Sequence, residues 1–285
     1  MKCKQTPGNG NKSLSANPPL YGSISESTDV FATAAVKLRA AGCVFAEDEA
    51  RLLISAAPSL AALAAMMERR VRGEPVEHVI GWAEFCGLRI EVDPGVFVPR
   101  QRSEFLVRQA AALAGPQTVI ADLCCGSGAL GVALASALQQ AKLYSVDIDP
   151  AAVQCARRNA AVVCGHVFEG DLFEPLPSSL HGRVDIVLAN APYVPTDAIR
   201  LLPAEARVHE ARIALDGGAD GLDIQRRVAA EAPLWLAPGG RLLVETSQRQ
   251  APQTAELFVR SGLIAQVTRS DELDATIIIG TKPSA

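Results

Sequence analysis

The residues best suited to chemistry follow the apolar run VDIVLA, and they are Asn190, Ala191, Pro192 and Tyr193. The Asn190 carboxamide oxygen and a neighbouring backbone carbonyl can both accept hydrogen bonds from a planar NH2 group. Tyr193 can stack on that planar group. The lone pair of the NH2 nitrogen would then point at an electrophile. The structural alternative is a strand followed by an Asn-Pro turn, with Tyr193 used for packing. The tetrapeptide by itself leaves both interpretations open.

A second candidate site lies in the run VIADLCCGSGALGVALA, which predicts a strand, a glycine-containing turn and a helix. Gly126 and Gly128 permit close approach of the backbone to a ligand, and the following helix N-terminus offers free N–H groups. A tight turn without a ligand gives the same pattern. Asp147 ends the next predicted strand, about 20 residues on, where an acid can accept both hydroxyls of a ribose. Together these features predict a nucleoside cofactor.

The cofactor is either a dinucleotide or S-adenosylmethionine. Gly131 completes the Gly-x-Gly-x-x-Gly pattern that seats a pyrophosphate in dinucleotide folds. Asp122, at the start of the turn, would repel a pyrophosphate but suits a ligand with an ammonium group and a cationic sulfur. We therefore expect S-adenosylmethionine. Asp171 is placed to bind the adenine amino group, although a simple loop acid fits equally well. The predicted cofactor site also includes the flanking residues Cys124, Ile148 and Leu172.

The elements that must position these residues are apolar strand-like runs alternating with Ala-rich helices from about residue 119 onwards. Continuous apolar strands between helices predict a parallel sheet covered on both faces. The last two runs, LIAQVTRS and ATIIIGT, have too few residues between them for a crossover helix, so we expect an antiparallel hairpin. In such sheets ligands bind at the carboxyl ends of the strands, where Asn190 would face the cofactor.

The chain from roughly 74 to 281 resembles the HemK-type protein-(glutamine) methyltransferases. The resemblance rests on the order and spacing of these segments: VPRQRSEFLV, DLCCGSGALG, VDIDPAAVQCARRNA, EGDLF, NAPYVP, EARVHEARIALDGGADGL and APGGRLLVE. It implies a class I methyltransferase fold, with an antiparallel last strand and a small N-terminal helical domain joined by a β-hairpin. It also implies that S-adenosylmethionine is held by Asp122, Gly126, Gly128, Asp147 and Asp171. Asn190 and Tyr193 would hold the amide of a glutamine.

Two departures from that family bear on the acceptor. The usual tetrad is Asn-Pro-Pro-Tyr, whereas this chain has Ala191, which can still supply a backbone carbonyl with a less fixed φ. The helical segment before the hairpin is also shorter than the family's substrate-binding domain, so the chain is most similar to a sub-group without an assigned substrate. We expect methylation of a protein glutamine, with a peptide chain release factor as one acceptor. The alternative is a small-molecule amide or amine, or a nucleobase amino group.

Composition limits the remaining possibilities. The chain has 285 residues, a formal net charge of -4 and seven cysteines. Its mild negative charge disfavours nucleic acid as a partner, and the absence of a long apolar run predicts a cytoplasmic protein without a membrane segment. The adjacent Cys124 and Cys125 are expected to pack rather than bind a metal, because no second pair has ligand spacing. The oligomeric state is not predicted.

We expect a disordered arm at 1–28, a helical substrate-recognition domain at 29–73, a hairpin connector at 74–98 and the methyltransferase domain at 99–285.

Overall fold

The structure is a computed structural model that describes residues 28–138 and 140–284. The arm predicted at 1–28 lies outside the described residues, except for its last residue. The described residues form two compact units, one ending at Ile80 and the other beginning at Gly81, which are described separately. Within the described ranges no helix is both long and apolar enough to cross a membrane.

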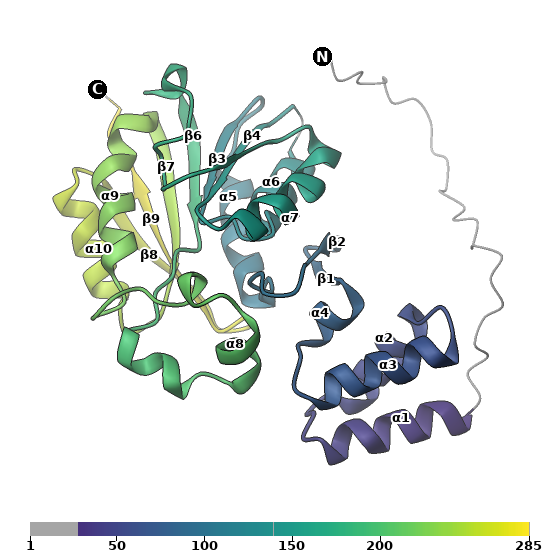
Figure 1. Ribbon diagram of the computed structural model, residues 1–285. Coiled ribbons are helices and arrows are strands. Elements are labelled where there is room, and N and C mark those ends of the chain that lie inside the picture. Colours follow the sequence, from purple (N-terminus) through teal and green to yellow (C-terminus); the bar gives the residue numbers. More distant parts are fainter. Residues whose placement is uncertain (1–27, 139, 285) are drawn as a thin grey trace. The chain divides into compact units, whose positions relative to one another are not determined.

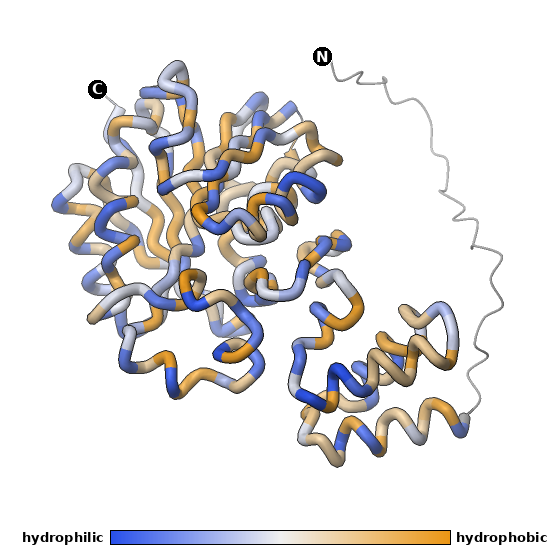
Figure 2. The backbone as a smooth tube through the Cα atoms, viewed as in Figure 1, coloured by the Kyte–Doolittle hydropathy of each residue, from blue (hydrophilic) through white to orange (hydrophobic). Residues whose placement is uncertain are grey.

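The first unit is a small helical bundle. Its helices are α1 Thr28–Ala40, α2 Ala46–Ala56, α3 Leu60–Val71 and α4 Val76–Ile80 (Figure 1). Apolar residues recur along the helices between hydrophilic ones (Figure 2), and they meet in one core that includes Leu38, Leu53 and Met67. A buried ion pair joins Arg70 of α3 to Glu49 of α2, with 2.6 Å between Nε and Oε2. The predicted short helical segment is therefore a bundle with its own apolar core.

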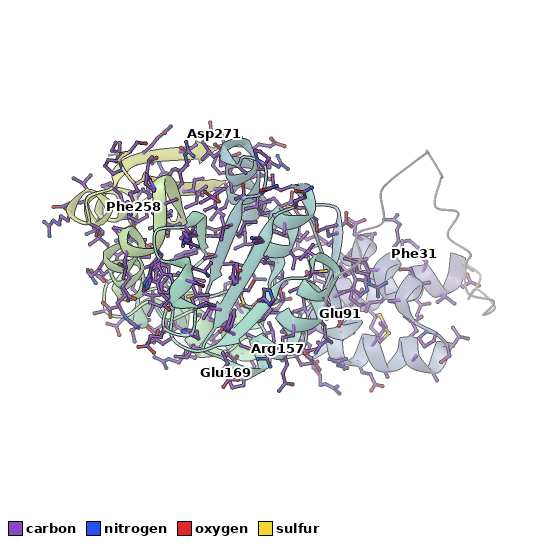
Figure 3. The ribbon with its side chains drawn as sticks, turned by 90° about the horizontal axis from the view of Figure 1, so that it is seen from above. Phe31, Glu91, Arg157, Glu169, Phe258 and Asp271 are labelled. Atoms are coloured by element: carbon purple, nitrogen blue, oxygen red, sulfur yellow. The ribbon has the colours of Figure 1, made fainter. Side chains whose placement is uncertain are left out.

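A two-stranded antiparallel hairpin opens the second unit, with β1 at Trp82–Phe85 and β2 at Leu88–Glu91. Within the segment predicted as a hairpin connector, residues 76–80 form helix α4, which belongs to the first unit. The Asn159 side chain of α7 (Pro150–Ala160) ties the hairpin to the second unit by bonding both the N–H and the carbonyl of Glu91. Glu91 is labelled in Figure 3.

The second unit is built on a seven-stranded sheet in the order β5-β4-β3-β6-β7-β9-β8 (Figure 1). Strands β3 to β7 are parallel, and β9 runs antiparallel between β7 and β8. This arrangement confirms the predicted fold class and the antiparallel hairpin at the end of the chain. The strands are β3 Val119–Leu123, β4 Lys142–Asp147, β5 His166–Glu169, β6 Val184–Ala189, β7 Leu236–Thr246, β8 Ile264–Ser270 and β9 Ala275–Thr281.

Helices cover both faces of the sheet, and each face has its own apolar core. Residues of α5 and α6 pack on one face, and residues of α9 and α10 pack on the other, among them Phe258, which is fully buried (Figure 3). Burial on both faces explains the nearly continuous apolar strands of the sequence. The remaining helices of this unit are α5 Glu104–Leu113, α6 Ala129–Ala137, α8 Ala204–His209, α9 Asp223–Trp235 and α10 Ala251–Arg260. Short 3-10 turns lie at Gln101–Ser103, Ala161–Val163, Ser178–Leu180, Thr196–Leu201 and Arg212–Ala214.

Candidate active site

A cavity of about 880 Å³ lies at the carboxyl ends of the parallel strands β3 to β7, as expected for an open parallel sheet. Its volume falls in the range of small-molecule and cofactor sites. Ten of the twelve residues predicted for cofactor or acceptor binding line it, namely Cys124, Gly126, Asp147, Ile148, Asp171, Leu172, Asn190, Ala191, Pro192 and Tyr193. Asp122 and Gly128 are not in its lining. The fold therefore brings most of the predicted site together, although it comes from four separate strand ends.

The loop between β3 and α6 lies beside the cavity, and its backbone adopts conformations that favour glycine. Gly126 has φ of +56°, and a Cβ atom there would meet no heavy atom within 4 Å, so this position opens on free space. Gly128 has φ of +79° and is the N-cap of α6, where an added Cβ would lie 3.3 Å from the Ala156 side chain. Gly126 thus leaves room for a ligand, whereas Gly128 lets the turn pack against α7.

Asp122 supports this loop from below. Its carboxylate is fully buried and accepts a hydrogen bond from the Gly131 N–H at 3.0 Å, while its Oδ1 atom has no hydrogen-bond partner among the described residues. Burial raises the pKa of the Asp122 carboxyl to about 7, against the lowering effect of the Gly131 hydrogen bond. A Cβ atom on Gly131 would lie only 2.7 Å from Asp122 Oδ2. The third glycine of the motif therefore serves the close packing of α6 on the sheet.

Asp147 at the end of β4 is directed at the cavity. Its Oδ2 atom accepts a hydrogen bond from the Gly126 N–H at 2.7 Å, and its Oδ1 atom accepts one from the Asp149 N–H at 2.9 Å. Burial raises the pKa of this carboxyl, and these two N–H groups oppose the increase. Because each carboxylate oxygen has two lone pairs, both oxygens can still accept a hydroxyl group from a ligand.

The outer part of the cavity combines apolar and charged groups. Ile148 is 49% exposed although it is a large aliphatic residue, and Leu172, which also lines the cavity, is buried with φ of +49°. Asp171 forms an ion pair with Arg227, with 2.7 Å between Oδ2 and Nη2, and both side chains line the cavity. An apolar slot with an acidic group at its edge fits an adenine ring. Together with Asp147 and the loop at Gly126, this region fits S-adenosylmethionine.

Asn190 follows the last residue of β6 and lies at the centre of the sheet edge, because β6 pairs with β3 on one side and β7 on the other. Its Nδ2 atom donates a hydrogen bond to the Ser103 hydroxyl at 3.4 Å. This contact leaves the carboxamide oxygen of Asn190 to accept a hydrogen bond from a ligand. Ala191 is buried and keeps the neighbouring backbone in the lining of the cavity.

Tyr193 is fixed by two charged residues from distant segments. Its hydroxyl accepts a hydrogen bond from Arg102 Nη2 at 2.7 Å and donates one to Glu245 Oε1 at 3.2 Å. Arg102 Nε also contacts Glu245 Oε1 at 3.1 Å, so the three side chains form a closed triangle. Burial and the negative charge of Glu245 raise the pKa of Tyr193 well above its usual range, and Arg102 opposes this increase. Tyr193 is therefore a neutral, immobilised wall of the cavity.

The backbone around Tyr193 is held by Gln250, at the start of α10. Gln250 Nε2 donates to the carbonyls of Tyr193 at 2.9 Å, Asp220 at 3.1 Å and Gly221 at 3.4 Å. A Cβ atom on Gly221 would lie 2.3 Å from the Tyr193 carbonyl oxygen, so only glycine fits there. The glycine-rich run ALDGGADGL thus supports the backbone of the tetrapeptide.

Sequence reasoning missed the contributions of Glu245, Gln250 and Ser103 to this site. The signal for Glu245 was present, since it is an acid near the carboxyl end of an apolar strand, as Asp122 and Asp147 are. Ser103 and Gln250 give no such signal, because they reach the site from loops distant in sequence. Arg100 and Arg102 also line the cavity, whereas His209 and Glu104 are not in its lining.

Comparisons with known proteins agree with this geometry. The family model of the methyltransferase small domain matches residues 87–221. The release factor glutamine methyltransferase of Geobacter sulfurreducens is 39% identical over 223 residues, covering 78% of each chain. That of Mycolicibacterium smegmatis is 39% identical over 231 residues, covering 79% of this chain and 82% of the relative. A 4-amino-L-phenylalanine/4-methylamino-L-phenylalanine methyltransferase of Streptomyces pristinaespiralis is 34% identical over 203 residues, covering 69% of both chains.

Solved structures show the same fold. A methyltransferase from Pyrococcus furiosus aligns with a TM-score of 0.53 at 18% identity, covering 69% of this chain and 90% of that one. A T. thermophilus 16S rRNA methyltransferase, solved with AdoMet and guanosine, aligns with a TM-score of 0.51 at 20% identity, covering 70% and 49%. With the sheet order, the cavity and the relatives in agreement, the chain belongs to the release factor glutamine methyltransferase family and is an S-adenosylmethionine-dependent methyltransferase.

Proposed function

We propose that this enzyme methylates the side-chain amide nitrogen of a glutamine in a protein, and that its acceptor is a peptide chain release factor with a Gly-Gly-Gln motif. One observation carries the proposal: the Asn190 tetrapeptide and the loop at Gly126 with Asp147 line the same cavity. An NH2-binding group and a nucleoside-binding group thus share one space. The names of the relatives that cover more than two thirds of this chain support the acceptor.

Each part of the cavity has a proposed role toward the methyl donor. S-adenosylmethionine supplies a methyl group activated on a cationic sulfur. Asp147 would accept the ribose hydroxyls, and the backbone at Cys124 and Gly126 would approach the amino acid end of the donor. Ile148 and Leu172 would enclose the adenine ring, while Asp171 would accept its amino group through the oxygen that does not bind Arg227. Asp122 and Gly128 act indirectly in this scheme, by fixing the loop.

The acceptor side of the cavity suits a planar amide. The Asn190 carboxamide oxygen and the Ala191 carbonyl would each accept one N–H of the glutamine NH2 group. The Tyr193 ring is immobilised through its hydroxyl and would stack on the plane of the amide. Orientation of this kind lowers the entropic cost of the reaction, which matters because the amide nitrogen is a weak nucleophile. Catalysis then rests on positioning and on electrostatics.

A second acceptor is favoured by one comparison. The Streptomyces pristinaespiralis relative is named for methylation of 4-amino-L-phenylalanine, a free amino acid with a planar aromatic amine. An aromatic NH2 group has the same hydrogen-bonding geometry as a primary amide and would fit the same tetrapeptide. A nucleobase amino group is disfavoured by the net charge of -4.

The test is methyl transfer from isotopically labelled S-adenosylmethionine to three substrates: a release factor, the same factor with its motif glutamine replaced by alanine, and 4-amino-L-phenylalanine. We expect label only in the intact release factor, located on the glutamine by mass spectrometry. Label in the amino acid alone would replace the proposed acceptor with the small-molecule one. Label in the alanine-substituted factor would refute the assignment of the methylated residue.

The mechanism is tested by Asn190→Ala. This variant should bind S-adenosylmethionine with the wild-type Kd, because Asn190 contacts the acceptor in this proposal, while turnover should fall by about 100-fold or more, as for loss of a group that orients a reactant. Isothermal titration and single-turnover assays measure the two quantities separately. Unchanged methyl transfer by this variant would refute the role of the tetrapeptide.

A further inference from the structure

Glu245 has an unsatisfied carboxylate oxygen at the wall of the cavity. The residue is near the end of β7, and the pairing of Ala189 with Val244 places it level with Asn190 on the neighbouring strand. Its side chain is only 2% exposed and lines the cavity. Oε1 receives hydrogen bonds from both Tyr193 and Arg102, whereas the buried Oε2 has no hydrogen-bond partner among the described residues.

A buried carboxylate oxygen without a donor is costly, because burial removes the water that would otherwise solvate its charge. When such an atom belongs to a residue that lines a cavity, a bound ligand can supply the donor. The cavity that Glu245 lines also contains the proposed NH2-binding tetrapeptide at Asn190. The acceptor NH2 group is therefore the donor that the site lacks.

We propose that Glu245 is a catalytic residue, whose Oε2 accepts a hydrogen bond from the acceptor NH2 group and takes up the proton that this nitrogen loses. The inference rests on the proposed function, in which the acceptor is a planar NH2 group. Arg102 and Tyr193 hold Oε1, so the carboxylate cannot rotate away, and the second oxygen stays fixed beside the acceptor. Asn190 orients the amide, and Glu245 removes its proton.

Methyl transfer to the acceptor nitrogen conserves atoms and charge. The nitrogen–carbon bond to the methyl group forms as the carbon–sulfur bond breaks, and the electron pair of that bond stays on the sulfur, which becomes a neutral thioether. The nitrogen gains a positive charge and loses one proton to Glu245 Oε2. The carboxylic acid then returns this proton to water. No further reactant is required.

Glu245→Gln tests the proposal, because it keeps the shape of the side chain and removes its basicity. Glu210→Gln is the matched control. Glu210 is also a buried carboxylate paired with an arginine, Arg100, and its Oε2 likewise has no hydrogen-bond partner within residues 28–138 and 140–284, but it is not in the lining of the cavity. Both proteins are compared with the wild type for thermal stability, Kd of S-adenosylmethionine, and kcat and KM for the acceptor.

We expect Glu245→Gln to lower kcat by about 100-fold, the usual effect of losing a general base, with the Kd of S-adenosylmethionine unchanged. Binding of the acceptor to the complex with S-adenosylhomocysteine, measured by titration, should also weaken, which gives a readout independent of turnover. Glu210→Gln should keep a kcat near that of the wild type. A Glu245→Gln protein with wild-type kcat, or an equal loss in Glu210→Gln, would overturn the inference.

Failure of this inference and failure of the proposed function give different results. If the wild type methylates the release factor and Glu245→Gln does so equally well, the proposed function stands and the role of Glu245 is refuted. If the wild type methylates only 4-amino-L-phenylalanine, the same variants are measured on that amine, and a 100-fold lower kcat for Glu245→Gln is again expected. A wild type that methylates neither acceptor would overturn both proposals.

Discussion

The buried Asp122 carboxyl should make the stability of the second unit depend on pH in an unusual direction. Burial raises the pKa of this group from its usual 3.8 to about 7 in the folded protein. Between these values the folded state binds a proton that the unfolded state releases. The free energy of unfolding therefore falls as the pH rises from about 4 to about 7, and it is constant above that range.

The size of the effect follows from the shift. Each pKa unit corresponds to 1.36 kcal/mol, so the penalty is about 4 kcal/mol at pH 8 and between about 1 and 2 kcal/mol at pH 5. Asp122→Asn cannot ionise, and its carboxamide oxygen can still accept the Gly131 N–H. The substitution should therefore raise the free energy of unfolding by about 3 kcal/mol more at pH 8 than at pH 5.

Urea unfolding followed by tryptophan fluorescence measures the free energy of unfolding of the second unit. The sequence contains two tryptophans, Trp82 and Trp235, and both belong to the second unit. Asp185→Asn is a suitable control, since Asp185 also accepts a hydrogen bond from β3, at the Val119 N–H, but is only half-buried. If Asp122→Asn has the same effect at both pH values, the argument that burial destabilises the ionised carboxyl is refuted.

Two further predictions concern the cofactor loop. Asp147→Ala should raise the Kd of S-adenosylmethionine by about 10- to 100-fold, because hydrogen bonds to a charged acceptor are lost; titration calorimetry measures this, and an unchanged Kd would show that Asp147 does not bind the ribose. Gly131→Ala should destabilise the second unit by about 1–3 kcal/mol through overpacking, since its Cβ would lie 2.7 Å from both Asp122 Oδ2 and Leu143 Cδ1. Gly115→Ala is its control, because nothing lies within 4 Å of that position, and equal melting temperatures for the two variants would contradict the packing argument.

Local signals in the sequence were sufficient to predict the elements of the fold, the cofactor loop and the tetrapeptide at Asn190. Alternating apolar strands and helices, a glycine turn with Asp147 beyond it, and Asn190 after a strand each depend on neighbouring residues, because turn geometry and burial periodicity are local properties. Since the carboxyl ends of parallel strands share one edge of the sheet, these signals also predicted that the residues after the separate strands would form one site.

The directions of side chains and the long-range contacts could not be read in the same way. Asp122 and Asp147 are both acids at the carboxyl ends of apolar strands, yet the Asp122 carboxylate is buried under the loop and bonds the Gly131 N–H, whereas Asp147 lines the cavity. Side-chain packing against α6, and the absence of a side chain at Gly131, decide that difference. Sequence reasoning placed Tyr193 as a stacking residue, and the structure adds that its hydroxyl is already engaged.

By itself, the sequence determined the fold class, the methyl donor and the tetrapeptide at which the acceptor is expected. Only the tertiary structure decided that Arg102, Tyr193 and Glu245 meet, although 91 residues separate the first two and 52 the last two. It also revealed that Glu245 Oε2 has no hydrogen-bond partner in the part of the chain that the structure describes. The physical reason is that strand order, rather than proximity in the chain, sets β7 beside β6 and so places a buried carboxylate next to Asn190.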